Sequence, residues 1–398
     1  MAAGGDAIGR LEDGRVVFCE GALPGEKVMA SMTEQRRDYG RAAVLEVLEP
    51  SPLRVAPPCP HVAAGCGGCS WQHVLPDGQT SLKVGIVADA LRRLAHLPDV
   101  RIEVAPGGVA VAGYRTSVNL AVDQTGRAVY HRRHGHAVVT VDSCLVTHPL
   151  LEELLVTGRF PGARRVGLRV GARTGDRLAA PDRGSARATV PDGTVVDPDG
   201  AIREDVGGRR WQVSARSFFQ SGPDAAEAIL EAVNRAAGDT VAQQARAGGA
   251  VVDLYAGVGV LGGCLADRWG AASLTAVESH DVAAADAAVN LADIGARVIV
   301  GEVADACREG AVADTPPAVV IADPARSGLG PSATAAVARL GSPVVVLVSC
   351  DPASLARDAG LLGDEGYRLD GVEVVDVFPG TFHTETVSRF VLEGSANG

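Results

Sequence analysis

From residue 216 onward the chain alternates short, uninterrupted apolar runs with helix-like segments, and this rhythm limits the possible folds more than any other feature. The apolar runs lie at 250–254, 274–277, 298–300, 318–322 and 344–348. Runs without polar alternation are typical of parallel strands that are buried on both faces. Parallel neighbours need crossover connections, which segments such as 282–291 supply as helices. Residues 216–398 therefore predict an α/β domain with a doubly wound, Rossmann-like sheet.

The first of these runs leads into a glycine-rich loop that is typical of nucleotide binding. Gly257 and Gly259 allow the backbone to turn sharply and to approach a ligand closely. Glu278 ends the second run, where a carboxylate can accept hydrogen bonds from both ribose hydroxyls. With Gly262 the loop also fits the dinucleotide fingerprint. These residues alone therefore leave a methyltransferase and a nicotinamide enzyme both open.

Further reactive side chains follow the later runs. Asp305 comes after the third, where it could meet an adenine amino group, and Asp323 after the fourth, where it should face the reacting centre. Cys350 ends the fifth run and precedes Asp-Pro, which predicts a loop-edge nucleophile instead of a buried structural cysteine. Glu385 opens the final predicted strand and, taken alone, would be an ordinary exposed carboxylate.

Five short motifs occur in one order over residues 216–398. They are Ser217-Phe218-Phe219-Gln220, Asp253-Leu254-Tyr255-Ala256-Gly257, Asp323-Pro324-Ala325-Arg326, Ser349-Cys350-Asp351-Pro352 and Phe378-Pro379 followed by His383-Thr384-Glu385-Thr386-Val387. With them the chain resembles the RNA uridine-5-methyltransferase family, which uses S-adenosylmethionine. The resemblance implies that Cys350 is the nucleophile and Glu385 the general base. It also implies a cofactor and base pocket formed by Gln220, Tyr255, Glu278 and Asp323, with Asp305 near the adenine.

The chemistry explains why a thiol and a carboxylate are needed together. Carbon 5 of uracil is too weak a nucleophile until a thiolate adds at carbon 6 and converts the ring to an enolate. After methyl transfer a carboxylate can remove the proton from carbon 5, and the base must be extruded from folded RNA. We expect ribosomal RNA as the substrate, with transfer RNA as the alternative. Two other classes are a noncatalytic RNA-binding protein, which Cys350 and Glu385 oppose, and an iron–sulfur oxidoreductase with a dinucleotide site.

Four cysteines form a second constellation, with three of them crowded between residues 59 and 69. A cytosolic protein seldom keeps disulfides, so the crowding favours a metal centre or redox chemistry. Thiols at Cys59, Cys66, Cys69 and Cys144 suit tetrahedral ligation of zinc or of an iron–sulfur cluster, and spacing alone does not separate the two. The tract at 66–73 resembles the cluster-binding subset of the family, which implies a 4Fe–4S cluster, with zinc as the alternative.

The part of the chain before residue 216 predicts two further domains. Residues 1–52 hold short apolar strands between turns, and they resemble the TRAM domain, which implies an OB-like, RNA-binding β-barrel. We expect Arg36, Arg37 and Arg41 to contact RNA there. Residues 53–215 predict a mixed α+β central domain that carries the cysteines, with a helix near 82–97.

Overall charge and composition restrict the partners. A net charge of -11 argues against nonspecific coating of nucleic acid, although a local basic groove remains compatible with it. Short basic clusters occur at 35–41, 131–134 and 164–165, and each alone is typical of a solvated face. Lys27 and Lys83 are the only lysines, so an anion-binding surface would use guanidinium groups. With no signal sequence and no apolar run that could span a membrane, we expect a cytoplasmic monomer.

Overall fold

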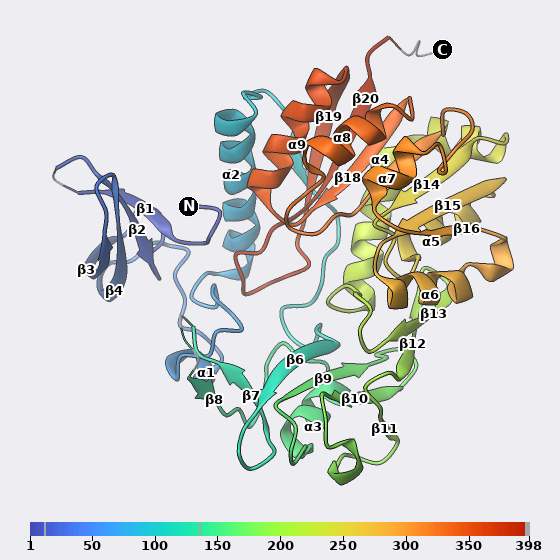
Figure 1. The fold of residues 1–398 in the computed structure, drawn as a ribbon. Coiled ribbons are helices and arrows are strands. Elements are labelled where there is room, and N and C mark those ends of the chain that lie inside the picture. The colour runs from blue at the N-terminus through green and yellow to red at the C-terminus, as the bar shows by residue number, and fades with distance from the viewer. Residues whose placement is uncertain (12, 134, 136, 395–398) are drawn as a thin grey trace.

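A computed structural model describes residues 1–11, 13–133, 135 and 137–394. Figure 1 shows a small blue sheet at the N-terminus, a green sheet-rich part below, and a large α/β part that runs to the C-terminus. Within the described residues, no helix combines the length and apolar character that crossing a membrane requires.

The N-terminal part is a four-stranded sheet with a small core. Its strands are β1 (Ala7–Arg10), β2 (Val16–Glu20), β3 (Lys27–Gln35) and β4 (Tyr39–Glu49). Its buried core contains only Ala7, Cys19, Ala22 and Ala42, because most β3 side chains face solvent. The pairing runs β1-β2-β4-β3, so β1 and β3 are the edges. The described strands thus form an open sheet, whereas we expected a closed barrel.

The central part is built on a six-stranded sheet in the order β11-β10-β9-β6-β7-β8. Helix α3 packs Leu151, Leu154 and Leu155 on this sheet, and alternate side chains of β9 are buried beneath it. The elements are α1 (Pro60–Ala63), β6 (Ser117–Val122), β7 (Ala128–His131), β8 (Val138–Val139), α3 (Pro149–Thr157), β9 (Arg165–Val170), β10 (Arg177–Pro181), the 3₁₀ turn η1 (Ser185–Arg187) and β11 (Thr194–Val196).

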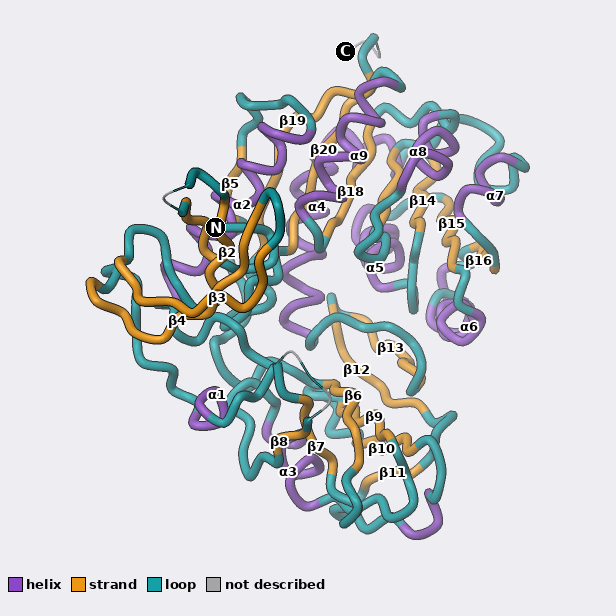
Figure 2. The backbone as a smooth tube through the Cα atoms, turned by 60° about the vertical axis from the view of Figure 1, so that its left-hand side comes forward, coloured by secondary structure: helices purple, strands orange, loops and turns teal. Residues whose placement is uncertain are grey.

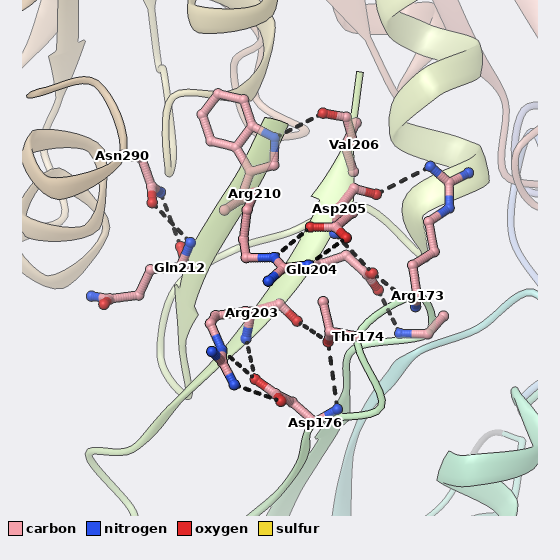
Figure 3. A network of polar contacts seen from close by, with 12 residues as sticks. Arg173, Thr174, Asp176, Arg203, Glu204, Asp205, Val206, Arg210, Gln212 and Asn290 are labelled. Atoms are coloured by element: carbon pink, nitrogen blue, oxygen red, sulfur yellow. Dashed lines mark hydrogen bonds and ion pairs between the residues drawn. The ribbon is translucent and has the colours of Figure 1, made fainter. Parts of the chain in front are cut away.

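A hairpin of β12 (Ala201–Val206) and β13 (Arg209–Ser214) joins the central part to the C-terminal part. On one side Trp211 and Val213 are fully buried in the core of the C-terminal part. On the other side the buried Glu204 carboxylate accepts hydrogen bonds from the amides of Ala172 (2.6 Å) and Arg173 (3.0 Å). Figure 3 shows this network, which fastens the loop at 171–176 to the hairpin.

The C-terminal part confirms the predicted doubly wound sheet. Its strands run in the order β16-β15-β14-β17-β18-β20-β19-β5, and β20 is antiparallel to both of its neighbours. Its elements are α4 (Pro223–Arg246), β14 (Ala250–Leu254), α5 (Val260–Trp269), β15 (Ser273–Glu278), α6 (Asp281–Asn290), η2 (Ala292–Ile294), β16 (Arg297–Val300), α7 (Val303–Arg308), β17 (Val319–Ala322), α8 (Gly330–Ala338), β18 (Val344–Ser349), α9 (Pro352–Asp364), β19 (Tyr367–Val375) and β20 (Glu385–Leu392).

Two elements that precede the hairpin belong to this sheet as well. Helix α2 (Pro76–Leu94) lies beside α9 in Figure 1 and buries Val87 and Leu91 in the core on that face. Strand β5 (Ile102–Val104) pairs in parallel with β19 as the edge strand. Residues 76–104 therefore pack with the C-terminal part, although they fall inside the predicted central domain. Helices α2, α7, α8 and α9 cover one face of the sheet, and α4, α5 and α6 cover the other (Figure 2).

Candidate active site and cysteine pocket

The carboxyl ends of β14 and β17 border a cavity of about 500 Å³. Tyr255, directly after β14, has a positive φ of 60°, a strained conformation for a residue with a side chain. Gly259 caps α5 with φ 94°, and a Cβ there would lie 2.9 Å from Leu291. The Asn290 side chain donates to the Val258 carbonyl at 3.0 Å and steadies this loop. The described lining is Phe218, Phe219, Gln220, Ala226, Asp253, Tyr255, Ala256, Gly257, Val258, Val260, Leu261 and Asp323.

Acidic side chains give this cavity its polar character. Asp253 accepts a hydrogen bond from the Gly262 amide at 2.8 Å, while its other carboxylate oxygen is buried without a partner in the described structure. Burial raises the pKa of Asp253 to about 7. Glu278 accepts hydrogen bonds from the amides of Gly257 (2.8 Å) and His280 (2.7 Å), so it fixes the glycine loop. Sequence motifs named Asp253, but no role was predicted for it.

Of the predicted cofactor residues, Asp305 differs most from expectation. It lies in the first turn of α7, is exposed, and forms an ion pair with Arg308 at 2.7 Å. The preceding acid Glu302 is closer to the cavity, since its charge adds to the burial that raises the pKa of Tyr255 to about 12. The structure brings Gln220, Tyr255, Gly257 and Asp323 together around the cavity, whereas Gly259, Glu278 and Asp305 lie outside its described lining.

Cys350 and Glu385 meet beside Asp323. Ser349 at the end of β18 pairs with Thr386 of β20, so continuing this antiparallel register sets Cys350 opposite Glu385. Burial raises the pKa of Cys350 to about 11, and the charges of Glu385 and Asp323 add to the shift. Burial also raises the pKa of Glu385 well above its usual value and that of Asp323 to about 7. Burial therefore shifts all three groups toward their neutral forms.

Arg326 supplies the opposing positive charge. Its guanidinium lies 3.0 Å from Nδ1 of His383 and lowers the pKa of both Cys350 and Glu385 against the effect of burial. Both Arg326 and His383 stood within sequence motifs, but no role was predicted for either. Asp323 also accepts a hydrogen bond from the Gln220 side chain at 3.3 Å.

The loop at 376–384, which leads into Glu385, is held by residues far away in the sequence. Lys83 is completely buried, and its ammonium donates to Asp376 (2.7 Å) and to the Phe378 carbonyl (3.1 Å). The Gly380 amide donates to Gln79 of α2 at 2.6 Å. Lys83 is one of only two lysines in the chain, but no sequence pattern predicts its burial or this contact.

The cysteine-bearing segment touches the same loop. The Trp71 amide donates to the Gly380 carbonyl at 2.8 Å, and the Phe382 amide donates to Ser70 Oγ at 3.3 Å. The cysteine segment and the Glu385 loop therefore share main-chain hydrogen bonds.

The four predicted cysteines line one cavity of about 600 Å³. Burial raises the pKa of Cys69 to about 11, and the nearby Cys144 and Cys66 add to the shift. The Tyr130 hydroxyl lies 3.6 Å from the Cys144 sulfur. The donor set of four thiols in a largely apolar cavity fits thiolate ligation in composition. Among the described residues, however, no three His, Cys, Asp or Glu side chains are close enough to hold a metal ion.

Comparisons with known proteins match the N-terminal part by itself and the chain over nearly its full length. Residues 3–45 match the model of the TRAM domain. A Streptomyces avermitilis protein described as an uncharacterized RNA methyltransferase is 34% identical, with 100% of this chain and 97% of that protein aligned. An uncharacterized RNA methyltransferase from Gloeobacter violaceus is 32% identical over 98% of this chain and 94% of its own length.

The solved structures include a tRNA (uracil-54, C5)-methyltransferase of Pyrococcus abyssi in complex with S-adenosyl-L-homocysteine. It superposes with a TM-score of 0.69 at 23% identity, covering 96% of this chain and 99% of that one. At this identity the likeness establishes a shared fold over nearly the whole chain.

Proposed function

The chain belongs to the RNA methyltransferase family of these relatives, and we propose that it transfers a methyl group from S-adenosylmethionine to carbon 5 of a uridine in RNA. Membership sets aside both the noncatalytic RNA-binding protein and the iron–sulfur oxidoreductase. The observation that supports the uridine assignment is the β18–β20 register, which ends at the Ser349–Thr386 pair and so brings the adjacent residues Cys350 and Glu385 close enough for their charges to interact. A carbon 5 methylation needs these two groups, and a transfer to nitrogen or oxygen does not.

The cofactor belongs in the cavity at the end of β14. It is lined by the glycine loop and by Gln220 and Asp323, which offer polar groups to a small-molecule ligand. The unpartnered oxygen of Asp253 offers an acceptor for a polar ligand. Glu278 would hold the ribose beside the glycine loop, and Tyr255 would flank the nucleoside. S-adenosylmethionine supplies the methyl group on a sulfonium cation.

The residues of the chain then act in sequence. The Cys350 thiol gives up its proton to solvent water, and its sulfur bonds to carbon 6 of the extruded uracil. The resulting enolate would take up, at carbon 5, the methyl group that the bound cofactor supplies. The Glu385 carboxylate removes the proton from carbon 5, and the double bond re-forms as the Cys350 thiolate leaves.

The raised pKa values fit this order of events. Burial raises the pKa of Cys350, Asp323 and Glu385 because it penalises their charged forms. A bound cation favours ionisation of acids nearby. We infer that the charge of the cofactor helps to form the Cys350 thiolate and the Glu385 carboxylate, so that activation waits for binding.

The cysteine pocket belongs to the same proposal as the site of a 4Fe–4S cluster. Cys59, Cys66, Cys69 and Cys144 would hold it, and the apolar lining from Val62, Val118 and Val141 would exclude water. Anaerobic purification should give about four iron and four sulfide per chain with broad visible absorbance. If the purified protein instead contains zinc and shows no visible absorbance, the site binds zinc and the cluster assignment is wrong.

The test is methyl transfer to RNA from a strain that lacks the gene. Purified protein, S-adenosylmethionine and this RNA should yield 5-methyluridine by nucleoside mass spectrometry, and fragment mapping should assign it to ribosomal or to transfer RNA. Methylation of another base, or of no base, would reject the proposal.

A further inference from the structure

Besides the cofactor cavity and the cysteine pocket, a groove of about 770 Å³ opens between the central sheet and the cysteine loop, by which we mean residues 59–69. Its polar lining includes Arg115, Asn119, Tyr130, His131, Arg132 and Arg133. Among the described lining residues there is no Asp or Glu, although the whole chain carries a net charge of -11. His134, the last residue of the basic cluster predicted from the sequence, lies outside the described residues.

Main-chain contacts fix the shape of this groove. Cys66 and Arg132 form an antiparallel bridge, and the Gly67 amide donates to the His131 carbonyl at 3.2 Å. The Arg133 amide donates to the Gly65 carbonyl at 3.1 Å. Arg132 and Arg133 therefore project from a backbone segment that is hydrogen-bonded to the cysteine loop.

The charge in the groove is available to a ligand. Arg133 is paired with Glu20 at 2.8 Å, whereas Arg132 is exposed and has no carboxylate partner among the described residues. The arginines of the N-terminal sheet differ, because Arg36 is paired with Glu34 at 2.6 Å and Arg41 with Asp6 at 3.2 Å.

Arg115 connects the groove to the active site. It lines both this groove and the cysteine cavity. It also lies close enough to His383 that its charge adds to the burial and the Arg326 charge that lower the pKa of that imidazole to about 4. Positive charge thus extends from Arg326 beside Cys350, through Arg115, to Arg132.

We propose that this groove binds the phosphodiester backbone of the single-stranded RNA segment that flanks the target uridine, an inference that rests on the proposed function. Guanidinium groups bind phosphate oxygens in a bidentate manner. An extruded base requires its neighbouring backbone to be splayed away from a duplex, and a narrow groove without carboxylates suits such a strand. The Arg115 and Arg132 side chains make the phosphate contacts.

The test uses two full-length variants, Arg132→Gln and Arg115→Gln/Arg132→Gln. The control is Arg297→Gln, which removes an exposed arginine on β16, an edge strand of the C-terminal sheet. The probe is a fluorescent single-stranded RNA of roughly 20 nucleotides, long enough to cross such a groove. Its dissociation constant is measured over a range of salt concentrations.

Each lost contact should flatten the plot of log affinity against log salt by about 0.7. At low salt, Arg132→Gln should weaken binding about 3- to 10-fold and the double variant further, while Arg297→Gln stays at the wild-type value. Cofactor affinity and kcat at saturating RNA should be unchanged in Arg132→Gln. An unaltered salt slope in Arg132→Gln and in the double variant, or an equal loss in Arg297→Gln, would overturn the groove assignment.

The groove assignment and the proposed function can fail independently of each other. If the wild-type protein forms no 5-methyluridine, the reaction is wrong whatever the binding data show. If it does form 5-methyluridine and Arg132→Gln keeps the full kcat/KM, only the groove assignment fails.

Discussion

The cofactor cavity and the cysteine pocket are constructed in opposite ways. The cofactor cavity lies at the ends of parallel strands, whose hydrogen-bonded register fixes Asp253, Asp323 and Cys350 before any ligand arrives. The four thiols of the cysteine pocket lie outside the strands, in loops beside α1, β6 and β7, and among the described residues no three metal-ligating side chains are close enough to hold a metal ion. The sheet fixes the positions of the reactive side chains in advance, whereas a site in loops depends on its ligand for its final shape.

The largest effect should come from the strand-built site. Cys350→Ala removes the nucleophile, so methylation should fall by at least about 10⁴-fold. Since Cys350 lies outside the described lining of the cavity, cofactor affinity by calorimetry should stay within about threefold of the wild-type value. Methylation at near the original rate would show that another group forms the adduct.

Glu385→Gln should uncouple the two halves of the reaction. Without a base the adduct cannot eliminate, so turnover should fall about 10²- to 10⁴-fold while a protein–RNA band accumulates on a denaturing gel. Cys350→Ala/Glu385→Gln is the matched control and should give no band. If Glu385→Gln gives no adduct, Glu385 is not the general base that removes the proton from carbon 5.

Cys144→Ser sharpens the contrast between the two pockets. It should abolish visible absorbance and reduce bound iron from about four per chain toward zero, because one ligand is lost. Cofactor binding at the sheet should stay within about threefold, since the strands do not depend on the metal. Cys307→Ser, at a buried cysteine of the C-terminal part, is the control and should leave the iron content unchanged. Equal loss of cofactor binding and iron in Cys144→Ser would mean that the pockets fold as one unit.

The smallest predicted effect concerns stability and pH. The pKa of Asp323 is raised from 3.8 to about 7 in the folded protein, so the folded state keeps a proton that the unfolded chain releases between about pH 4 and 7. Stability without cofactor should therefore fall as pH rises through that window. Asp323→Asn should remove this loss and raise the melting temperature at pH 8 by on the order of 2 °C, with little change at pH 4. An identical shift at both pH values would exclude titration as the cause.

Much of the sheet-built site could be predicted from the sequence, because apolar runs and the residues that end them are local signals. These signals predict that Asp323 and Cys350 follow strands, and in the structure they directly follow β17 and β18. The position of Asp305 after a strand does not reveal that its side chain forms an ion pair with Arg308 in α7. Likewise, no local pattern indicates that β5 pairs with β19 or that Lys83 reaches Asp376, since these contacts join residues nearly 300 positions apart.

The hydrogen bond between Trp71 and Gly380 has a consequence for how the protein tolerates damage. Cys69 lies two residues before Trp71, and Glu385 five residues after Gly380, along a stretch that also contacts Ser70. Because these hydrogen bonds join the two segments, damage that displaces the cysteine segment should also displace the loop that carries Glu385.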